Sequence, residues 1–271
     1  MLKKKILVII SGKLTFFSSE NFYKIKESFK EYDLEFCLFP WQGQSAELKK
    51  KFLDLYKPIH FEEIETYDFE KDVKSIKFPD YAGNPIGTLN MYRSICVSFN
   101  IIDKIYFKEL NKPDYVLRFR SDILPKDNQK FINRAQIQGS ILVPDRYHWN
   151  GLNDQIFLIN FKDLKVFENF DNFLKKHIEE NRFFSSEYIF LRFIKKYLKI
   201  KYTNFDYNIM RFKNNFKKFK NIESKMLFID EINCKINKLK FKIRNFKNHY
   251  IKKINRNKFQ EIFIDLDNNA S

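Results

Sequence analysis

Residues 88–125 read TLNMYRSICVSFNIIDKIYFKELNKPDYVLRFRSDILP, and this stretch decides the fold class. In its first part apolar residues recur every three or four positions, the spacing that places them on one face of an α-helix. The members of this stripe are Met91, Ile95, Phe99, Ile102, Tyr106 and Leu110. The helix ends before Pro113, and the apolar run Tyr115–Phe119 that follows has the length of a buried β-strand. A helix that leads into a buried strand is the repeating unit of an α/β domain.

The same alternation continues on both sides of this stretch. Short apolar runs between turn residues predict further strands at Ile6–Ile10, Leu34–Phe39, Ile59–Phe61, Ile141–Val143 and Ile156–Ile159. Apolar residues at helical spacing predict two earlier helices, one with Phe22, Ile25 and Phe29, and one capped by Ser45 with Leu48, Phe52, Leu55 and Tyr56. Residues 62–87 are predicted to form a long loop. We therefore predict an α/β, Rossmann-like fold, in which flanking helices cover a mostly parallel sheet.

Glycine and proline divide the chain into two parts. All seven prolines and all six glycines lie at or before Gly151, which predicts that residues 152–271 are largely helical. Near the C-terminus an apolar stripe repeats in alternating steps of three and four: Ile229, Ile232, Ile236, Leu239, Ile243, Phe246 and Tyr250. We predict an α/β domain at residues 1–220 and a basic, amphipathic helical extension at 221–271.

The positive charge belongs mainly to this extension. The chain carries 50 Lys and Arg against 34 Asp and Glu, a net charge of +16. Residues 232–260 hold ten basic residues and no acidic one, which leaves 16 − 10 = 6 for the rest of the chain. This distribution argues against nucleic acid as the partner of the main domain. Contact with an anionic membrane is the interpretation we favour; pairing with another helix, or packing back on the domain, are the alternatives.

The sequence predicts a cytoplasmic protein that can lie at a membrane surface. Cys37, Cys96 and Cys234 are widely separated, which fits free thiols in a reducing compartment better than disulfides. The N-terminal lysines and Ile6–Ile10 imitate a signal peptide, but this apolar run is short and lacks a small-residue cleavage site, so a buried strand explains it better. No segment approaches the roughly 20 apolar residues of a membrane span.

Charged residues follow the strand at Tyr115–Phe119 directly. Arg118, Arg120 and Asp122 alternate with uncharged residues, so in extended geometry their side chains share one face. Ligands of open α/β sheets bind beyond the carboxyl ends of the strands. Arg binds phosphate bidentately, and Asp can hold a metal ion or a sugar hydroxyl. The cluster predicts a nucleotide-diphosphate site; the alternative is a salt bridge at an exposed strand end.

This segment resembles the signature position of GT-A-type glycosyltransferases. That family places an Asp-x-Asp motif at the end of a central strand, where it binds the sugar nucleotide, usually through a divalent cation; Arg120-Ser-Asp122 is in register with it. More narrowly, residues 5–211 resemble the WavE-type lipopolysaccharide and capsule synthesis proteins. The similar elements are Ser11-Gly12, a Tyr92-bearing helix, Arg120-Ser-Asp122, Asn153-Asp154-Gln155, Glu187 at a helix start and Asp206-Tyr-Asn-Ile-Met-Arg211. The resemblance implies a GT-A-like fold and sugar transfer from a nucleotide-sugar donor to a capsule or lipooligosaccharide acceptor, which can be lipid-linked.

The chain departs from the metal site that this resemblance implies. Arg120 stands where the motif has its first Asp, so one metal ligand is missing and a cation takes its place. Asp122 can still bind Mg²⁺ or Mn²⁺ through the phosphates, because such ions need only one or two protein carboxylates. Alternatively, Arg118 and Arg120 stabilise the departing diphosphate without a metal. Because the Asp is retained, metal assistance is the hypothesis we favour.

Two carboxylates, Asp154 and Glu187, are candidate catalytic residues on the acceptor side. Transfer with inversion needs a base that takes the proton of the acceptor hydroxyl, whereas a retaining reaction need not use one of this kind. Asp154 lies in a polar turn before the strand Ile156–Ile159, and Glu187 opens a helix whose apolar stripe runs from Ile189 to Leu198. Both also have structural explanations, Asp154 as a turn residue and Glu187 as a partner of the helix dipole.

Five further residues are candidates for donor binding: Ser11, Gly12, Tyr92, Arg93 and Arg211. Gly12 permits the backbone to approach a nucleotide closely, although a turn after a strand needs glycine anyway. Tyr92 and Arg93 can face the nucleotide or form a solvated helix end. Arg211 can serve in an ion pair instead.

Competing catalytic patterns are absent from the sequence, which has no Walker loop, GxGxxG, GxSxG or HExxH motif. We therefore predict a nucleotide-sugar-dependent glycosyltransferase. Two other classes remain as alternatives: a nucleic-acid-binding protein that uses the basic extension, and an inactive scaffold of polysaccharide assembly.

Overall fold

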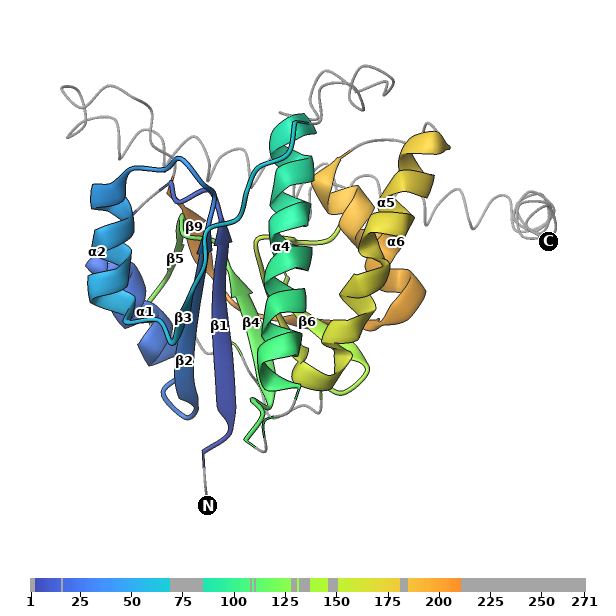
Figure 1. Ribbon diagram of the computed structural model, residues 1–271. Helices are drawn as coiled ribbons and strands as arrows, with labels where there is room; N and C mark the ends of the chain where they lie inside the picture. Colours follow the sequence, from blue (N-terminus) through green and yellow to red (C-terminus); the bar gives the residue numbers. More distant parts are fainter. Residues whose placement is uncertain are drawn as a thin grey trace. The chain divides into compact units, whose positions relative to one another are not determined.

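The architecture is that of a computed structural model, shown in Figure 1. It describes residues 3–15, 17–68, 85–107, 109, 111–127, 131, 137–145, 151–180 and 185–210. The predicted extension, the domain boundary at residue 220, the candidate Arg211 and most of the predicted 62–87 loop lie outside the described residues.

A seven-stranded sheet forms the centre of the described chain, in the order β3-β2-β1-β4-β7-β6-β8. The strands are β1 (Lys5–Gly12), β2 (Asp33–Pro40), β3 (His60–Phe61), β4 (Tyr115–Phe119), β6 (Ser140–Pro144), β7 (Ile156–Asn160) and β8 (Lys199–Thr203). Neighbours pair in parallel except at β7, which runs antiparallel to both β4 and β6. A separate two-stranded antiparallel sheet joins β5 (Ile123–Pro125) to β9 (Tyr207–Ile209). The predicted α/β fold with a mostly parallel sheet is confirmed.

Helices cover both faces of the large sheet (Figure 1). One face packs against α1 (Ser19–Ser28) and α2 (Ala46–Tyr56), and the other against α4 (Pro85–Tyr106), the 3-10 helix η1 (Phe161–Asn169), α5 (Phe170–Glu179) and α6 (Ser186–Tyr197). Each face of the sheet has its own hydrophobic core, and β1 contributes residues to both. Ile6 and Val8 pack on the α1 and α2 side, and Leu7 and Ile9 pack on the α4 side. The continuous apolar run of β1 is what a parallel strand buried on both faces requires.

The strand order reverses beside β1. From β1 the chain builds β2 and β3 on one side, and α4 then returns it to β4 on the other side. Such a reversal opens a crevice at the carboxyl ends of the two central strands, where open α/β folds bind ligands. The topology therefore predicts a ligand site beyond Gly12 and Phe119.

Strand β7 brings a further segment to the same edge. Because it runs antiparallel to β4, its first residue, Ile156, pairs with the last residue of β4, Phe119. Residues just before β7 therefore lie next to residues just after β4.

The structure corrects two sequence expectations. Helix α4 begins at Pro85 rather than Thr88, since proline is well tolerated in the first turn of a helix, and it ends at Tyr106. The described residues after Gly151, which are 152–180 and 185–210, are less helical than predicted, because they also contain β8 and β9. These strands are short, and in Lys199–Thr203 only Ile200 and Tyr202 are apolar, an alternation too brief to predict a strand. None of the helices in the described ranges is long and apolar enough to span a membrane.

Ser45 caps α2, as predicted, by accepting a hydrogen bond from the backbone N–H of Leu48 at 3.3 Å. Ser45→Ala should lower the free energy of unfolding by about 1 kcal/mol, because one backbone donor loses its partner. Ser18 is the matched control, since it occupies the N-cap of α1 without a side-chain cap hydrogen bond. Urea unfolding followed by circular dichroism should show a clearly smaller cost for Ser18→Ala; equal costs would contradict the role of the Ser45 cap.

Candidate active site

The carboxyl ends of β1 and β4 lie side by side at the reversal of strand order. Ile10 pairs with Phe119, so Ser11 and Gly12 lie beside the residues that follow β4. Gly12 has a φ of +100°, a backbone conformation that favours glycine. The Ser11 hydroxyl is buried and has no hydrogen-bond partner within the described residues. This edge thus carries an unsatisfied polar group next to a buried glycine.

Arg118 is fully buried near the end of β4. Its Nη1 donates to the carbonyl oxygen of Gln155 at 2.6 Å, and its Nε is buried without a hydrogen-bond partner in the described part of the chain. Burial, followed by the charge of Arg120, lowers the pKa of Arg118 to about 10, so the guanidinium stays charged at neutral pH. A buried cation with an unused N–H is suited to bind an anion.

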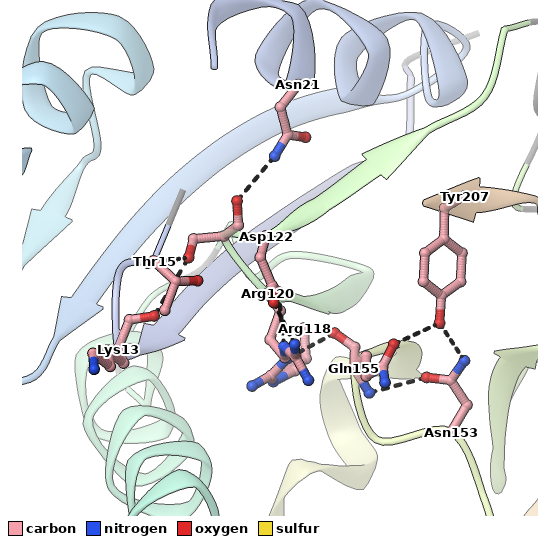
Figure 2. A network of polar contacts seen from close by, with 10 residues as sticks. Lys13, Thr15, Asn21, Arg118, Arg120, Asp122, Asn153, Gln155 and Tyr207 are labelled. Carbon is pink, nitrogen blue, oxygen red and sulfur yellow. Dashed lines mark hydrogen bonds and ion pairs between the residues drawn. The ribbon is translucent and has the colours of Figure 1, made fainter. Parts of the chain in front are cut away.

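Arg120 and Asp122 form a bidentate ion pair (Figure 2). Nε of Arg120 donates to Oδ1 of Asp122 at 2.8 Å, and Nη2 donates to Oδ2. The two side chains are 24% and 7% exposed, so the guanidinium lies at the border between the interior and solvent. Burial lowers the pKa of Arg120, but the Asp122 carboxylate outweighs burial and raises it. With Arg118 close by, the three charged residues singled out in the sequence lie together.

A turn brings Asp122 onto Arg120. Strand β4 ends one residue before Arg120, and Ser121 and Asp122 lie in a turn, so the expectation of one continuous extended segment is wrong here. Two contacts from distant elements fix the turn. The Asn21 side chain donates to the Ser121 carbonyl oxygen at 3.2 Å, and the backbone N–H of Met210 donates to the Asp122 carbonyl oxygen at 2.7 Å.

The groups around Asp122 do not fit a divalent metal ion. Both carboxylate oxygens already accept hydrogen bonds from Arg120, whose charge would repel a second cation. Across the described ranges, no three His, Cys, Asp or Glu side chains gather in a way that could hold a metal. The geometry therefore disagrees with the favoured hypothesis of Mg²⁺ or Mn²⁺ at Asp122 and fits the alternative in which arginines supply the positive charge.

Asp154 and Glu187 form a second charged group, at the start of α6. Asp154 is 2% exposed, and the hydroxyl oxygen of Tyr92 lies 3.5 Å from its Oδ2. Burial raises the pKa of Asp154, although Arg120 and Arg118 oppose the rise. Burial and then the charge of Asp154 raise the pKa of Glu187 to about 7. A carboxyl group with a pKa of about 7, such as Glu187, is suited to take up a proton near neutral pH, and Asp154, whose pKa is also raised, lies beside it.

Backbone contact holds these two carboxyl groups near each other. The backbone N–H of Leu152 donates to the Glu187 carbonyl oxygen at 2.8 Å. A Cβ at Gly151 would lie 2.0 Å from the backbone C and O of Glu187, so only glycine fits there. The last glycine of the chain therefore marks the place where the segment before β7 crosses the start of α6. The glycine just before Asn153-Asp154 is visible in the sequence, but the sequence does not show that its backbone contacts Glu187.

An amide network missed by sequence reasoning lies beside the guanidinium groups (Figure 2). Asn153 Nδ2 donates to the Tyr207 hydroxyl at 2.6 Å, this hydroxyl donates to Gln155 Oε1 at 3.0 Å, and the Gln155 N–H donates to Asn153 Oδ1 at 2.9 Å. The Gln155 carbonyl oxygen also accepts from the backbone N–H of Arg120 at 3.2 Å as well as from Arg118. The network thus connects the segment before β7 to the guanidinium groups.

The remaining candidates lie in different surroundings. The Tyr92 hydroxyl donates to the carbonyl oxygen of Ser186, which places it with the carboxylate pair. Arg93 contacts a different segment: its Nε donates to the Glu65 carbonyl oxygen at 3.4 Å, and its guanidinium lies 5.9 Å from the centre of the Tyr67 ring. The structure therefore does not bring Arg93 to the group formed by Arg118, Arg120 and Asp122.

Trp41 is a neighbour of the site that sequence reasoning overlooked. Its indole N–H donates to the Ser94 hydroxyl at 2.5 Å, and its ring lies close to Gly12, since a Cβ added there would be 3.8 Å from the indole nitrogen. Its position after β2 places an aromatic ring at the same edge of the sheet.

Comparisons with known proteins found likenesses to solved structures alone. No protein-family model and no curated protein matches the sequence. The galactosyltransferase LgtC, in complex with donor and acceptor sugar analogs, has a TM-score of 0.44 and 10% identity, covering 73% of this chain and 73% of that chain. The glycosyltransferase GlyE of Streptococcus pneumoniae has a TM-score of 0.40 and 12% identity, covering 74% and 45%. Mouse xyloside xylosyltransferase 1 has a TM-score of 0.40 and 8% identity, covering 74% and 84%.

All three neighbours are glycosyltransferases. At TM-scores below 0.5 these likenesses do not carry a reaction over to this chain, so its function is argued from its own site.

The raised pKa of Glu187 makes stability depend on pH. The folded state holds this proton up to about pH 7, whereas the free carboxyl releases it near 4.5, so the folded state binds more protons between these values. Stability should therefore fall as pH rises from about 4.5 to about 7. Glu187→Gln should lessen this fall and be about 1–2 kcal/mol more stable than the wild type at pH 8.

Urea unfolding at pH 5 and pH 8 measures this effect. Glu168→Gln, on the exposed side of η1, is the matched control and should follow the wild type. If Glu187→Gln lost as much stability as the wild type between the two pH values, a Glu187 that holds its proton up to about pH 7 would be ruled out.

Proposed function

We propose that this chain is a glycosyltransferase that moves a sugar from a nucleotide-sugar donor to a saccharide acceptor. One observation carries the proposal: two guanidinium groups meet at the carboxyl ends of β1 and β4, and a carboxylate pair, buried Asp154 and half-buried Glu187, lies beside them. The arginines suit the diphosphate of a donor, and the carboxyl groups suit a hydroxyl that must lose a proton.

The transfer step follows from this division of roles. An acceptor hydroxyl oxygen attacks the anomeric carbon of the donor sugar, and the bond from that carbon to the diphosphate oxygen breaks. The electron pair of the broken bond leaves with the diphosphate, whose growing negative charge the Arg118 and Arg120 guanidinium groups stabilise. The acceptor proton passes to the Asp154–Glu187 pair. A base in this position favours inversion at the anomeric carbon.

The donor side would include the two groups at the end of β1. The unpartnered Ser11 hydroxyl would bind a phosphate or sugar oxygen, and Gly12 beside it has no side chain to obstruct that ligand. Tyr92 would act on the acceptor side, through its contacts with the carboxylate pair.

The finer identity of the acceptor rests on the sequence resemblance. We propose a bacterial capsule or lipooligosaccharide acceptor of the kind served by WavE-type proteins, in growing or lipid-linked form. The basic extension predicted at 221–271 would hold the enzyme at the anionic inner membrane where such acceptors are found.

Donor binding gives the most direct test. Nucleoside diphosphates and sugar nucleotides at about 100 times their Kd should raise the Tm by about 5–10 °C. The corresponding nucleosides are the matched control and should stabilise less, because they lack the diphosphate. If no nucleotide raised the Tm in any buffer, with or without divalent ions, the proposed function would fail.

Turnover tests the arginine site itself. Asp122→Asn keeps the shape of the side chain but removes the charge that fixes Arg120, so it should lower the release of nucleoside diphosphate from the bound donor by about 100-fold or more. Far-UV circular dichroism and Tm check that the fold is kept. Near wild-type turnover in a folded variant would remove Asp122 from the site.

Membrane contact is tested with vesicles and the full chain. Sedimentation with vesicles that contain phosphatidylglycerol is expected, and it should weaken as salt rises, because each Lys or Arg near the surface contributes up to about 1 kcal/mol. Vesicles of phosphatidylcholine alone are the control. Equal recovery with both lipids, or none with either, would contradict the proposed role of the extension.

A further inference from the structure

The inference concerns how the donor diphosphate is held, and it rests on the proposed function. In the group formed by Arg118, Arg120 and Asp122, which we call the arginine site, the Arg120 guanidinium contacts the Asp122 oxygens to which a metal ion would otherwise bind. Both oxygens of Asp122 accept hydrogen bonds from Arg120, through Nε and Nη2. A cation bound to Asp122 would have to displace this bidentate contact, which is among the stronger kinds of charged hydrogen bond.

The pairing with Asp122 fixes Arg120 while leaving part of it free. No hydrogen bond in the described part of the chain uses Nη1 of Arg120, and its side chain is 24% exposed. Asp122 is held in turn by the Met210 N–H on its carbonyl oxygen, at 2.7 Å. The guanidinium is therefore oriented before any ligand arrives, so ligand binding costs little further ordering.

Arg118 supplies an independent sign that an anion belongs here. Its Nε is fully buried and has no partner within the described residues, and its Nη1 is fixed on the Gln155 carbonyl oxygen at 2.6 Å. A buried donor without a partner is costly to the folded state, and a ligand oxygen would remove that cost. The neighbouring Ser11 hydroxyl, also buried and unpartnered, points to the same need at the end of β1.

We infer that the donor diphosphate binds directly to the guanidinium groups of Arg118 and Arg120, without a divalent cation, and that Asp122 serves to position Arg120. The charge that a metal ion would bring is built into the chain at Arg120. Asp122 is thus a positioning residue and not a metal ligand.

Titration of the wild-type full chain separates this inference from the proposed function. UDP, GDP and ADP are titrated calorimetrically in EDTA and again in excess MnCl2. The nucleotide that binds should do so in EDTA, with a Kd that differs by less than about tenfold from its value in MnCl2. Binding that requires Mn²⁺, or that Mn²⁺ strengthens by more than tenfold, would overturn the inference and leave the proposed function standing. Absence of binding in both buffers would overturn both.

Substitutions at Arg120 test the source of the charge. Arg120→Gln should weaken nucleotide binding in EDTA by about 10- to 100-fold, the usual effect of losing a charged hydrogen bond. Arg120→Asp should abolish nucleotide binding in EDTA. In MnCl2 this variant should still bind nucleotide, because the substitution creates a pair of carboxylates around Ser121 that can hold Mn²⁺. Wild-type affinity of either variant in EDTA would overturn the inference.

A matched control covers the change in net charge. Lys51→Asp alters the charge by the same amount as Arg120→Asp, on the exposed side of α2, where Lys51 pairs with Glu47 and is 53% exposed. It should bind nucleotide as the wild type does in both buffers. A loss of affinity as large as that of Arg120→Asp would mean that overall charge, and not the guanidinium at this site, governs binding, and would overturn the inference. Circular dichroism verifies folding, and the wild-type titration remains decisive if Arg120→Asp does not fold.

Discussion

A charged guanidinium buried at the centre of the sheet is the constraint on which the rest of the site depends. Arg118 lies on a strand whose other residues are all buried, and removing such a charge from water is costly unless other groups compensate it. The compensation comes from the Gln155 carbonyl oxygen and from the charges of Asp154 and Asp122. Moving any of these groups away would leave the buried Arg118 charge less compensated and would destabilise the fold. The stability of the sheet therefore depends on the geometry of the site.

The same constraint sorts the charged residues into two functional sides. Arg120 is held by Asp122, which keeps its charge fixed at the ends of β1 and β4. Asp154 and Glu187 have no bidentate partner of this kind in the described part of the chain, and burial raises the pKa of both, although Arg120 and Arg118 oppose the rise at Asp154. The site thus combines a permanently positive side with a side whose charge changes near neutral pH, an arrangement that suits a reaction in which one partner leaves as an anion and the other gives up a proton.

Much of the fold could be predicted from the sequence, because long apolar periods specify their elements. Strand β4 has the predicted bounds, and Ser45 caps its helix as expected. The sequence also brought out the residues of both charged groups. The direction of β7 could not be predicted, since an apolar run of five residues looks alike in either orientation. For the same reason the contacts of Asn153 and Gln155 with Tyr207, some 52 residues away, required coordinates, as did the turn that folds Asp122 onto Arg120.

The reversed direction of β7 also determines which connection of the sheet can accept insertions next to the site. The segment from β6 to β7 leaves the sheet and re-enters it at the edge that carries the site, because β6 ends and β7 begins there. Insertions in this segment would reshape the mouth of the site while leaving the strand pairing intact, at a modest entropic cost. Insertions between α4 and β4 would emerge at the opposite edge and leave the site untouched. Changes in the β6–β7 connection can therefore alter substrate specificity, whereas fusion partners can be inserted in the connection between α4 and β4.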